Sequence, residues 1–285
     1  MAMSFREAEY AGWTARAESY DTLFTTISNQ AIPHILAALG DLSGKAVLDV
    51  CCGPGHLAAA AVQRGASAEG IDFAPTMIAR AARNYPTIPF HEGDAESLPY
   101  GSGSFDHVVC AFGIMHLQQP EAAIAEAHRV LRPSGIYAFT QWALNDDLLR
   151  IVSAAIAEHG RSDLDIPQAP PPMRFSDPDE CRRVLRIYGF REIRIEQITL
   201  QWRTDRAEAL LELIYSSAVR AALLLEAQEP EQRACIHKAI IDAVTAQSEG
   251  RDLLIRRPAV LASGKSYWAA EACKASRDNG SANFA

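Results

Sequence analysis

Two carboxylates and a glycine-bounded turn are the features of this sequence that point most directly to chemistry. Asp49 lies in an apolar run that breaks into a turn containing Gly53 and Gly55, and Asp72 ends the next apolar segment. A buried parallel strand is apolar on both faces, so a carboxylate near its carboxyl end needs a partner such as a cofactor amine or backbone amides. Glycines allow a sharp turn and let backbone N–H groups approach a ligand at the start of the following helix. The pattern therefore predicts a site for a nucleoside-containing cofactor.

His116 is the strongest candidate for acid–base chemistry. It follows the fourth apolar segment, where the edge of a sheet would meet an acceptor pocket. An imidazole there can take up a proton near neutral pH. The alternative interpretation is a histidine that caps the next helix or fills space. The other histidines lack the spacing of metal ligands, so the sequence predicts no metal site.

Short apolar segments alternate with alanine-rich stretches of helical length through the first half of the chain. The predicted strands are Ala46–Cys51, Ser67–Ile71, Ile88–Glu92, Phe105–Phe112 and Gly135–Trp142. The predicted helices are Leu57–Arg64, Pro75–Asn84 and Pro120–Leu131. Such alternation implies right-handed crossovers and a parallel sheet that helices cover on both faces.

The pattern changes after Trp142, where longer helical segments separate two late strands. The predicted helices are Asp146–His159, one that starts at Ser176 and ends at Gly189, Asp205–Ala227 and Pro230–Ser248. The predicted strands are Phe190–Trp202 and Pro258–Ala262. If these strands pair beside one another, the intervening helices must lie across the ligand edge of the sheet as a cap.

Composition limits the classes of function. A chain of 285 residues with a net charge of −8 suits a small globular enzyme better than a nucleic-acid-binding protein, which needs clustered Lys and Arg. No apolar run approaches the roughly 20 residues that span a membrane, and the N-terminus does not resemble a signal peptide. We therefore expect a cytoplasmic protein. Its six cysteines lack a Cys-x-x-Cys spacing and are predicted to be reduced thiols.

The chain resembles the class I S-adenosylmethionine-dependent methyltransferases in five segments that keep the family's order and spacing. These segments are residues 48–55, 70–77, 92–99, 104–109 and 126–135. The closest similarity is to small-molecule enzymes of the ubiquinone and menaquinone biosynthesis type. The resemblance implies an α/β fold with a Rossmann-like, mainly parallel seven-stranded sheet. It also implies helices on both faces, an antiparallel last strand and helical cap insertions.

Four regions follow from the resemblance and the order of elements. Residues 1–40 are expected to form a helical flap over the cofactor. The core is expected in residues 41–143, 174–203 and 256–266, and the substrate cap in residues 144–173 and 204–250. Residues 274–285 are small and polar, and we expect a mobile tail there.

The resemblance implies S-adenosylmethionine as cofactor, with S-adenosylhomocysteine as product, and assigns residues to its methionine end. Asp49, Gly53 and Gly55 would line this end through the carboxylate and backbone groups. Cys51 belongs to the same turn but stands where the family usually has glycine, so its side chain is expected to point into the strand packing.

Further residues are assigned to the adenosine end. Asp72 would take the ribose hydroxyls, and Phe73 and Met77 would flank the adenine. Asp94 and the Ala95 amide would read the adenine edge. The alternatives are that Asp72 only caps a helix, that Asp94 only stabilises a turn and that the apolar pair only packs.

The remaining assignments concern the sulfonium and the flap. The backbone of Ala111 and Phe112 would lie near the sulfonium end. Trp13 and Tyr20 lie in the segment that resembles the flap and would help to bind the cofactor. Tyr20 would contact the methionine carboxylate or the acceptor, which makes it a second catalytic candidate beside His116.

The function that these residues imply is methyl transfer to oxygen or carbon of a small, apolar metabolite. One alternative is an NAD(P)-dependent oxidoreductase, which the sequence disfavours because Ala58 replaces the third glycine of the dinucleotide fingerprint. The other is a catalytically inactive S-adenosylmethionine-binding protein. Frequent arginines between Arg174 and Arg206 form either a solvated face or an anion-binding patch. The sequence leaves a homodimer open.

Overall fold

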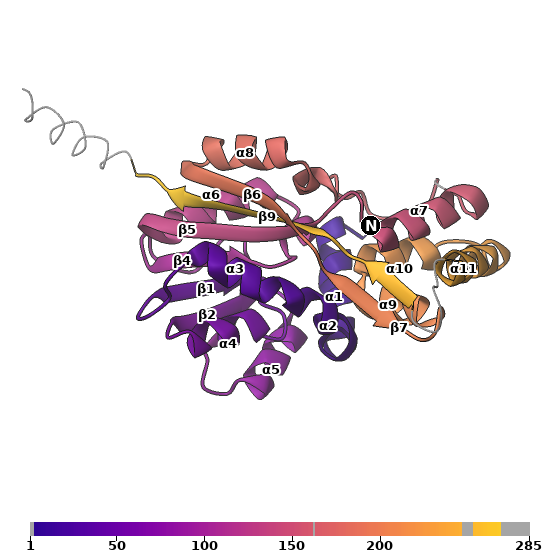
Figure 1. The fold of residues 1–285 in the computed structure, drawn as a ribbon, viewed down its shortest axis with the longest axis horizontal. Helices are drawn as coiled ribbons and strands as arrows, with labels where there is room; N and C mark the ends of the chain where they lie inside the picture. The colour runs from indigo at the N-terminus through magenta and orange to yellow at the C-terminus, as the bar shows by residue number, and fades with distance from the viewer. Residues whose placement is uncertain (1–2, 162, 247–252, 269–285) are drawn as a thin grey trace, which may run out of the picture.

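The computed structural model, which describes residues 3–161, 163–246 and 253–268, is built around a seven-stranded sheet (Figure 1). β9 pairs antiparallel with both of its neighbours, and the other neighbouring pairs are parallel. The predicted fold class is therefore confirmed, including its antiparallel last strand. In sheet order the strands are β3 (Phe90–Glu92), β2 (Ser67–Asp72), β1 (Ala46–Val50), β4 (Phe105–Cys110), β5 (Leu131–Trp142), β9 (Ala259–Ser266) and β6 (Phe190–Ile198). The tail predicted at residues 274–285 lies outside the described residues.

Helices cover both faces of the sheet because its central strands are apolar on both sides. In β1, Val47 belongs to one buried cluster and Leu48 to the other, as the alternation of side chains along a strand requires. Figure 1 shows helices below the sheet and others above it. Those below are α3 (Ile32–Leu39), α4 (His56–Gln63) and α5 (Pro75–Asn84), and those above are α6 (Pro120–Val130) and α8 (Pro178–Ile187).

The remaining elements gather beyond the carboxyl ends of the parallel strands, at the right of Figure 1. The N-terminal part consists of α1 (Phe5–Ser19), a π-helical turn (Tyr20–Phe24) and α2 (Thr25–Ser28). The later part consists of α7 (Asp147–His159), α9 (Ala209–Ser217), α10 (Val219–Glu226), α11 (Pro230–Thr245) and the two-stranded sheet of β7 (Gln201–Thr204) and β8 (Leu253–Arg256). None of the described helices is both long and apolar enough to cross a membrane.

Three local predictions were wrong, two of them where contacts or backbone geometry beyond the local pattern decide the structure. The strand predicted over Phe190–Trp202 is divided, because the chain leaves the large sheet after Ile198 and pairs with β8 from Gln201. The helix predicted over Asp205–Ala227 breaks at Ala218, whose φ of −124° and ψ of 86° are not helical.

The third wrong prediction concerns the start of α8. Asp177 caps this helix by accepting a hydrogen bond from the Asp179 N–H, whereas Ser176 ends the preceding 3₁₀ turn. The predicted boundary was therefore one residue early. β5 also starts earlier than expected, directly after α6 at Leu131.

Candidate functional site

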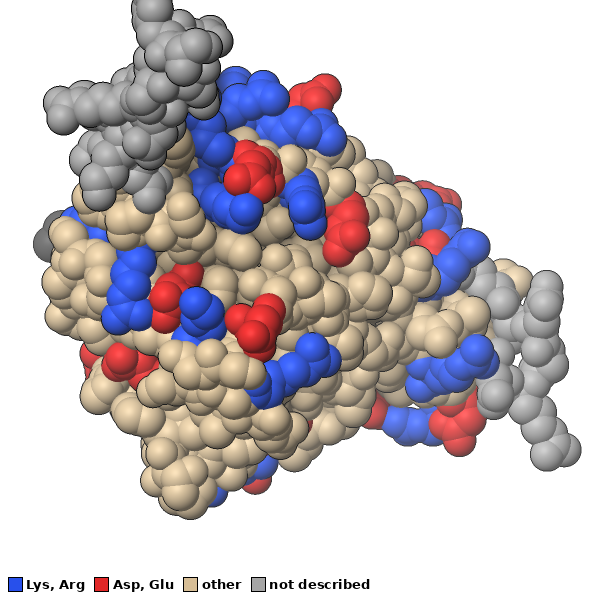
Figure 2. All heavy atoms as spheres, turned by 60° about the vertical axis from the view of Figure 1, so that its left-hand side comes forward, with Lys and Arg blue, Asp and Glu red and all other residues tan. Residues whose placement is uncertain are grey.

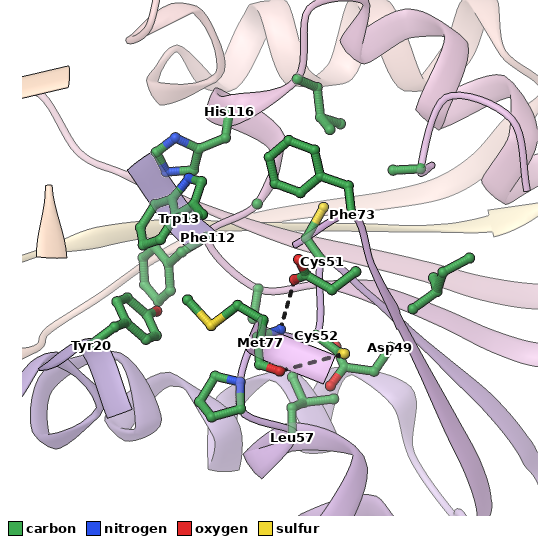
Figure 3. A pocket seen from close by; sticks show the side chains of 18 of the residues that line it. Trp13, Tyr20, Asp49, Cys51, Cys52, Leu57, Phe73, Met77, Phe112 and His116 are labelled. Carbon is green, nitrogen blue, oxygen red and sulfur yellow. Dashed lines mark hydrogen bonds between the residues drawn. The ribbon is translucent and has the colours of Figure 1, made fainter. Parts of the chain in front are cut away.

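A cavity of about 1040 Å³, including its open mouth, lies at the carboxyl ends of β1, β2 and β4, with α1 at its side (Figure 3). All of the predicted site residues except Gly55 line it. These residues are Trp13, Tyr20, Asp49, Cys51, Gly53, Asp72, Phe73, Met77, Asp94, Ala95, Ala111, Phe112 and His116. The position agrees with the general rule that open α/β sheets bind ligands at this edge.

Asp49 is a buried carboxylate at the base of the glycine turn, with 1% of its surface exposed. Its Oδ2 accepts a hydrogen bond of 3.1 Å from the Ala58 N–H in the first turn of α4. Burial raises the pKa of Asp49 to about 8, with the nearby Asp72 carboxylate adding to the effect. A cationic group in the cavity would restore the ionised form, so Asp49 is suited to bind an ammonium group.

Gly55 is placed behind the cavity wall by the packing of the turn. It precedes α4 with a φ of +85°, a backbone conformation that favours glycine. A Cβ at this position would lie 2.6 Å from Cζ of Phe90, so only glycine lets the turn pack closely against β3. Gly55 thus shapes the turn, while Gly53 is the glycine of this turn that lines the cavity.

Asp72 connects the glycine turn to the start of α5. Its Oδ2 accepts a 2.9 Å hydrogen bond from the Gly53 N–H, and its Oδ1 accepts one of the same length from the Ala74 N–H. Burial nevertheless raises the pKa of Asp72 to about 6, against these hydrogen bonds. The residue therefore supports the local structure and also presents a carboxylate to the cavity.

Two residues other than glycine adopt left-handed backbone conformations at adjacent strand ends. Cys51 follows β1 with a φ of +55°, and Phe112 follows β4 with a φ of +54°. Cys51 lines the cavity and also packs against Gly113. A Cβ added to Gly113 would lie 2.5 Å from the Cβ of Cys51. The Phe112 N–H donates a 2.9 Å hydrogen bond to Thr140 Oγ1. Backbone conformations of this kind persist only where the surroundings impose them, and they cluster at functional sites.

Asp94 follows β3 and is held by neighbours on both sides. Its Oδ1 accepts a hydrogen bond of 2.9 Å from the Glu96 N–H, which stabilises the turn. Its Oδ2 accepts one of 2.8 Å from Nη2 of Arg6 in α1. Ala95 is buried beside it. The sequence did not single out Arg6, because nothing local distinguishes it from the other charged residues of α1.

Aromatic side chains form the opposite wall of the cavity, as Figure 3 shows for Trp13, Tyr20 and Phe112. The rings of Trp13 and Tyr20 meet edge to face with centroids 5.3 Å apart. Burial, with the nearby carboxylates, raises the pKa of Tyr20 to about 12. The Tyr20 hydroxyl therefore stays neutral and is suited to donate a hydrogen bond to a ligand, and not to act as a base at neutral pH.

His116 lies at the top of this wall (Figure 3). Its Nδ1 is 2.8 Å from Oε2 of Glu9, and its ring meets Trp13 edge to face at 4.8 Å between centroids. The structure therefore joins His116 to a carboxylate that the sequence analysis did not select. Glu9 is 107 residues away in the chain, so no local signal could have identified it.

The N-terminal segment that was predicted to form a flap, and is called the flap below, is anchored to the core through Asp21 in the π-helical turn. Asp21 accepts hydrogen bonds from Arg80 and Asn84 of α5, and its Oδ1 lies 2.7 Å from Nε2 of His56 in α4. Burial raises the pKa of Asp21, but these three partners outweigh burial and lower it overall. α4 and α5 thus hold the N-terminal segment against the cavity.

The arginines between Arg174 and Arg206 are interspersed with acidic side chains. Arg182 and Arg183 of α8 pair with Asp179 and Glu180 of the same helix, and Arg174 also binds Glu180. Figure 2 shows basic and acidic side chains mixed over the face in view. This arrangement is that of a solvated surface with local ion pairs.

Within the described ranges, no three His, Cys, Asp or Glu side chains come together in a group able to hold a metal ion. The cap residues Ile214 and Leu225 are fully buried in the larger core cluster and are not among the cavity-lining residues. The polar residues Thr25, Ser28 and Asn29 of the flap line the cavity instead.

Comparison with known proteins agrees with this fold. Residues 47–135 match the family model described as a methyltransferase domain. Over 90 residues the chain is 42% identical to the demethylmenaquinone methyltransferase of Chlorobaculum parvum, an alignment that covers 31% of this chain and 37% of that protein. The chain spans less than half the length of the curated relatives that it matches.

Two solved structures share the fold across most of the chain. The YcgJ protein of Bacillus subtilis superposes with a TM-score of 0.57 at 19% identity, covering 84% of this chain and 99% of that one. A Haemonchus contortus phosphoethanolamine N-methyltransferase 2, solved with phosphomonomethylethanolamine and S-adenosylhomocysteine, gives a TM-score of 0.59 at 16% identity, covering 93% of this chain and 60% of that one. At these identities the similarity concerns the fold. The family model matched by residues 47–135, together with the shared fold, supports the resemblance to the class I S-adenosylmethionine-dependent methyltransferases.

Proposed function

We propose that this protein binds S-adenosylmethionine and transfers its methyl group to a small, apolar metabolite. The observation that carries the proposal is that Asp49, Asp72 and Asp94 line one cavity at the carboxyl edge of the sheet. Their order along the edge suits the ammonium, the ribose hydroxyls and the adenine amine of one adenosyl cofactor. Both the demethylmenaquinone methyltransferases and the N-methyltransferase with bound S-adenosylhomocysteine support this assignment by similarity.

The residues of the cavity fit this cofactor chemically. Asp49 is buried and accepts one hydrogen bond from the described residues. A cationic partner would stabilise its ionised carboxylate. Phe73 and the buried Met77 offer an apolar surface on which the adenine ring of the cofactor can pack. When bound, S-adenosylmethionine supplies an electrophilic methyl group, and the protein aligns the acceptor and excludes water. His116 would serve as the base, and Tyr20 would position a ligand.

Calorimetric titration of the purified protein with S-adenosylhomocysteine, and separately with NAD⁺ and NADP⁺, tests the cofactor. We expect binding of S-adenosylhomocysteine alone. Binding of a nicotinamide cofactor alone would instead support the oxidoreductase alternative.

A second assay distinguishes an enzyme from an inactive binding protein. Release of S-adenosylhomocysteine is followed with apolar acceptors, beginning with demethylmenaquinone because a relative is named for it. We expect turnover with an apolar acceptor. Tight cofactor binding without turnover across the acceptor panel would support the inactive binding protein.

A further inference from the structure

Glu9 of α1 is buried against His116, which lines the cavity. Among the described side chains, Glu9 is the one that hydrogen-bonds this imidazole. Only 1% of its surface is exposed. Its Oε2 lies 2.8 Å from Nδ1 of His116 and accepts a 3.0 Å hydrogen bond from the indole N–H of Trp13. Burying a carboxylate costs free energy unless hydrogen-bond donors replace the water that it loses. The two donors, His116 and Trp13, therefore explain how Glu9 can be buried here.

The contact determines which nitrogen of His116 faces the cavity. A carboxylate only accepts hydrogen bonds, so Nδ1 must carry the proton that it donates to Glu9. In the neutral ring the lone pair is then on Nε2, for which no hydrogen bond with the described residues exists. Because His116 lines the cavity, this lone pair is available to a ligand there. The edge-to-face contact with the Trp13 ring and the hydrogen bond to the buried Glu9 carboxylate restrict the imidazole to one orientation.

We propose that Glu9 is a positioning residue that keeps His116 as an Nε2 base, and that the methyl acceptor carries a weakly acidic hydroxyl, as a phenol or enol does. This inference rests on the proposed methyltransferase function. The hydroxyl proton moves to Nε2 of His116 while an oxygen lone pair forms the new O–C bond. The C–S bond breaks and leaves its electron pair on sulfur. The resulting imidazolium is stabilised by the Glu9 carboxylate until it releases the proton to water.

The position of Glu9 also connects the base to the flap. Glu9 belongs to α1, whereas His116 follows β4, so the pair exists only while α1 lies against the core. Thr76 of α5 donates a 2.8 Å hydrogen bond to the Thr14 carbonyl, and Arg16 donates one of 2.9 Å to the Tyr215 carbonyl of α9. These contacts place α1 between the core and the late helices. The packing of α1 against the core therefore completes the pair of Glu9 and His116.

Nitrogen NMR of the ligand-free protein tests the positioning role without any acceptor. The ¹⁵N shifts of His116 at mildly alkaline pH report which ring nitrogen carries the proton. We expect the Nδ1–H form in the wild type and in Glu9→Gln, whose amide oxygen still accepts, and a mixture of forms in Glu9→Leu. Glu18→Gln is the matched control, because Glu18 is an exposed acid on the same helix. An Nε2–H form in the wild type, or an unchanged spectrum in Glu9→Leu, would overturn the role of Glu9.

Turnover of simple phenols and the corresponding anilines tests the acceptor class. With phenols we expect Glu9→Leu to lower kcat about 100-fold and Glu9→Gln about tenfold, since the amide keeps the orientation but not the charge. The dissociation constant for S-adenosylhomocysteine should stay within about twofold in both variants. Faster turnover of the anilines by the wild type would overturn the hydroxyl assignment. If the wild type binds no S-adenosylhomocysteine, the proposed function fails, while the NMR result on Glu9 stands separately.

Discussion

The cavity has two sides that are built by different means. The cofactor side consists of Asp49, Asp72 and the turn from Cys51 to Gly55, and the acceptor side consists of Glu9, Trp13, Tyr20 and His116. On the cofactor side, carboxylates accept hydrogen bonds from backbone amides that are 2, 9 and 19 positions away in the chain. On the acceptor side, the central contact joins two side chains that are 107 positions apart.

Under the proposed function, this difference implies that cofactor affinity and the rate of methyl transfer depend on different parts of the cavity. Backbone amides are fixed by the strands and helices, so the cofactor side is rigid as soon as the sheet forms. The acceptor side requires α1 to lie in place over the sheet edge. Substitutions on the two sides should therefore have separable effects on cofactor affinity and on turnover.

His116→Ala should give the largest effect, because it removes the proposed base from the acceptor side. We expect kcat to fall by about 100- to 10,000-fold, while the dissociation constant for S-adenosylhomocysteine changes by less than about threefold. Steady-state kinetics and calorimetry on the same preparation measure the two quantities. Equal losses in both, or no loss, would remove His116 from the catalytic role.

Asp49→Asn should have the next largest effect, on the cofactor side. The amide is nearly isosteric but carries no charge to pair with an ammonium group. Loss of one partner of a buried charge pair costs at least about 2 kcal/mol, so we expect the dissociation constant for S-adenosylhomocysteine to rise by about 30-fold or more. Glu69→Gln is the matched control, because Glu69 lies on β2 but outside the cavity. Similar losses in both variants would contradict a specific role for Asp49.

The two sides also differ in how far the sequence could predict them. The glycine turn, Asp49 and Asp72 belong to patterns in which strand, turn and helix follow within a few residues, and all three lie near one another in the structure. Glu9 could not be found, because its role depends on packing across 107 positions. The same cause explains the two-stranded sheet of β7 and β8, whose partners are about 50 residues apart, and the break at Ala218. Local patterns thus predicted the core and its edge, and long-range packing decided the rest.

The pH dependence of stability in the ligand-free protein tests the burial of Asp49. Burial raises its pKa to about 8 from an ordinary value of 3.8, so the folded state holds the proton more tightly than the unfolded state does. The stability contributed by protonated Asp49 is complete below the ordinary value and is lost as the pH rises through the folded value. The free energy of unfolding of Asp49→Asn should therefore exceed that of the wild type by an amount that grows across this range to a few kcal/mol. A difference independent of pH, measured by urea denaturation, would contradict the raised pKa.

Gly12→Ala should affect the acceptor side alone. A Cβ at Gly12 would lie 2.4 Å from Cγ1 of Val219, which is buried in α10. Overpacking of this kind costs about 1–3 kcal/mol, which exceeds the gain of about 1 kcal/mol from replacing glycine in a helix. We expect faster hydrogen exchange in α1 and unchanged exchange in β1 and β4. Ala15→Leu, on an exposed position of the same helix, is the control. Faster exchange throughout the core would mean that the flap and the sheet do not form separate units.

Arg6→Ala should give the smallest effect, and it probes the place where the two sides meet. Arg6 belongs to the flap, yet it binds Asp94 at 2.8 Å, and both side chains are partly exposed, at 44% and 32%. Ion pairs exposed to this degree contribute less than about 1 kcal/mol, so the free energy of unfolding should fall by no more than that. The dissociation constant for S-adenosylhomocysteine should change by less than about fivefold, because the cofactor side keeps its backbone amides. A change of more than about tenfold would show that the flap contributes to cofactor binding through Asp94. Cofactor affinity and turnover would then not depend on separate sides of the cavity at this residue.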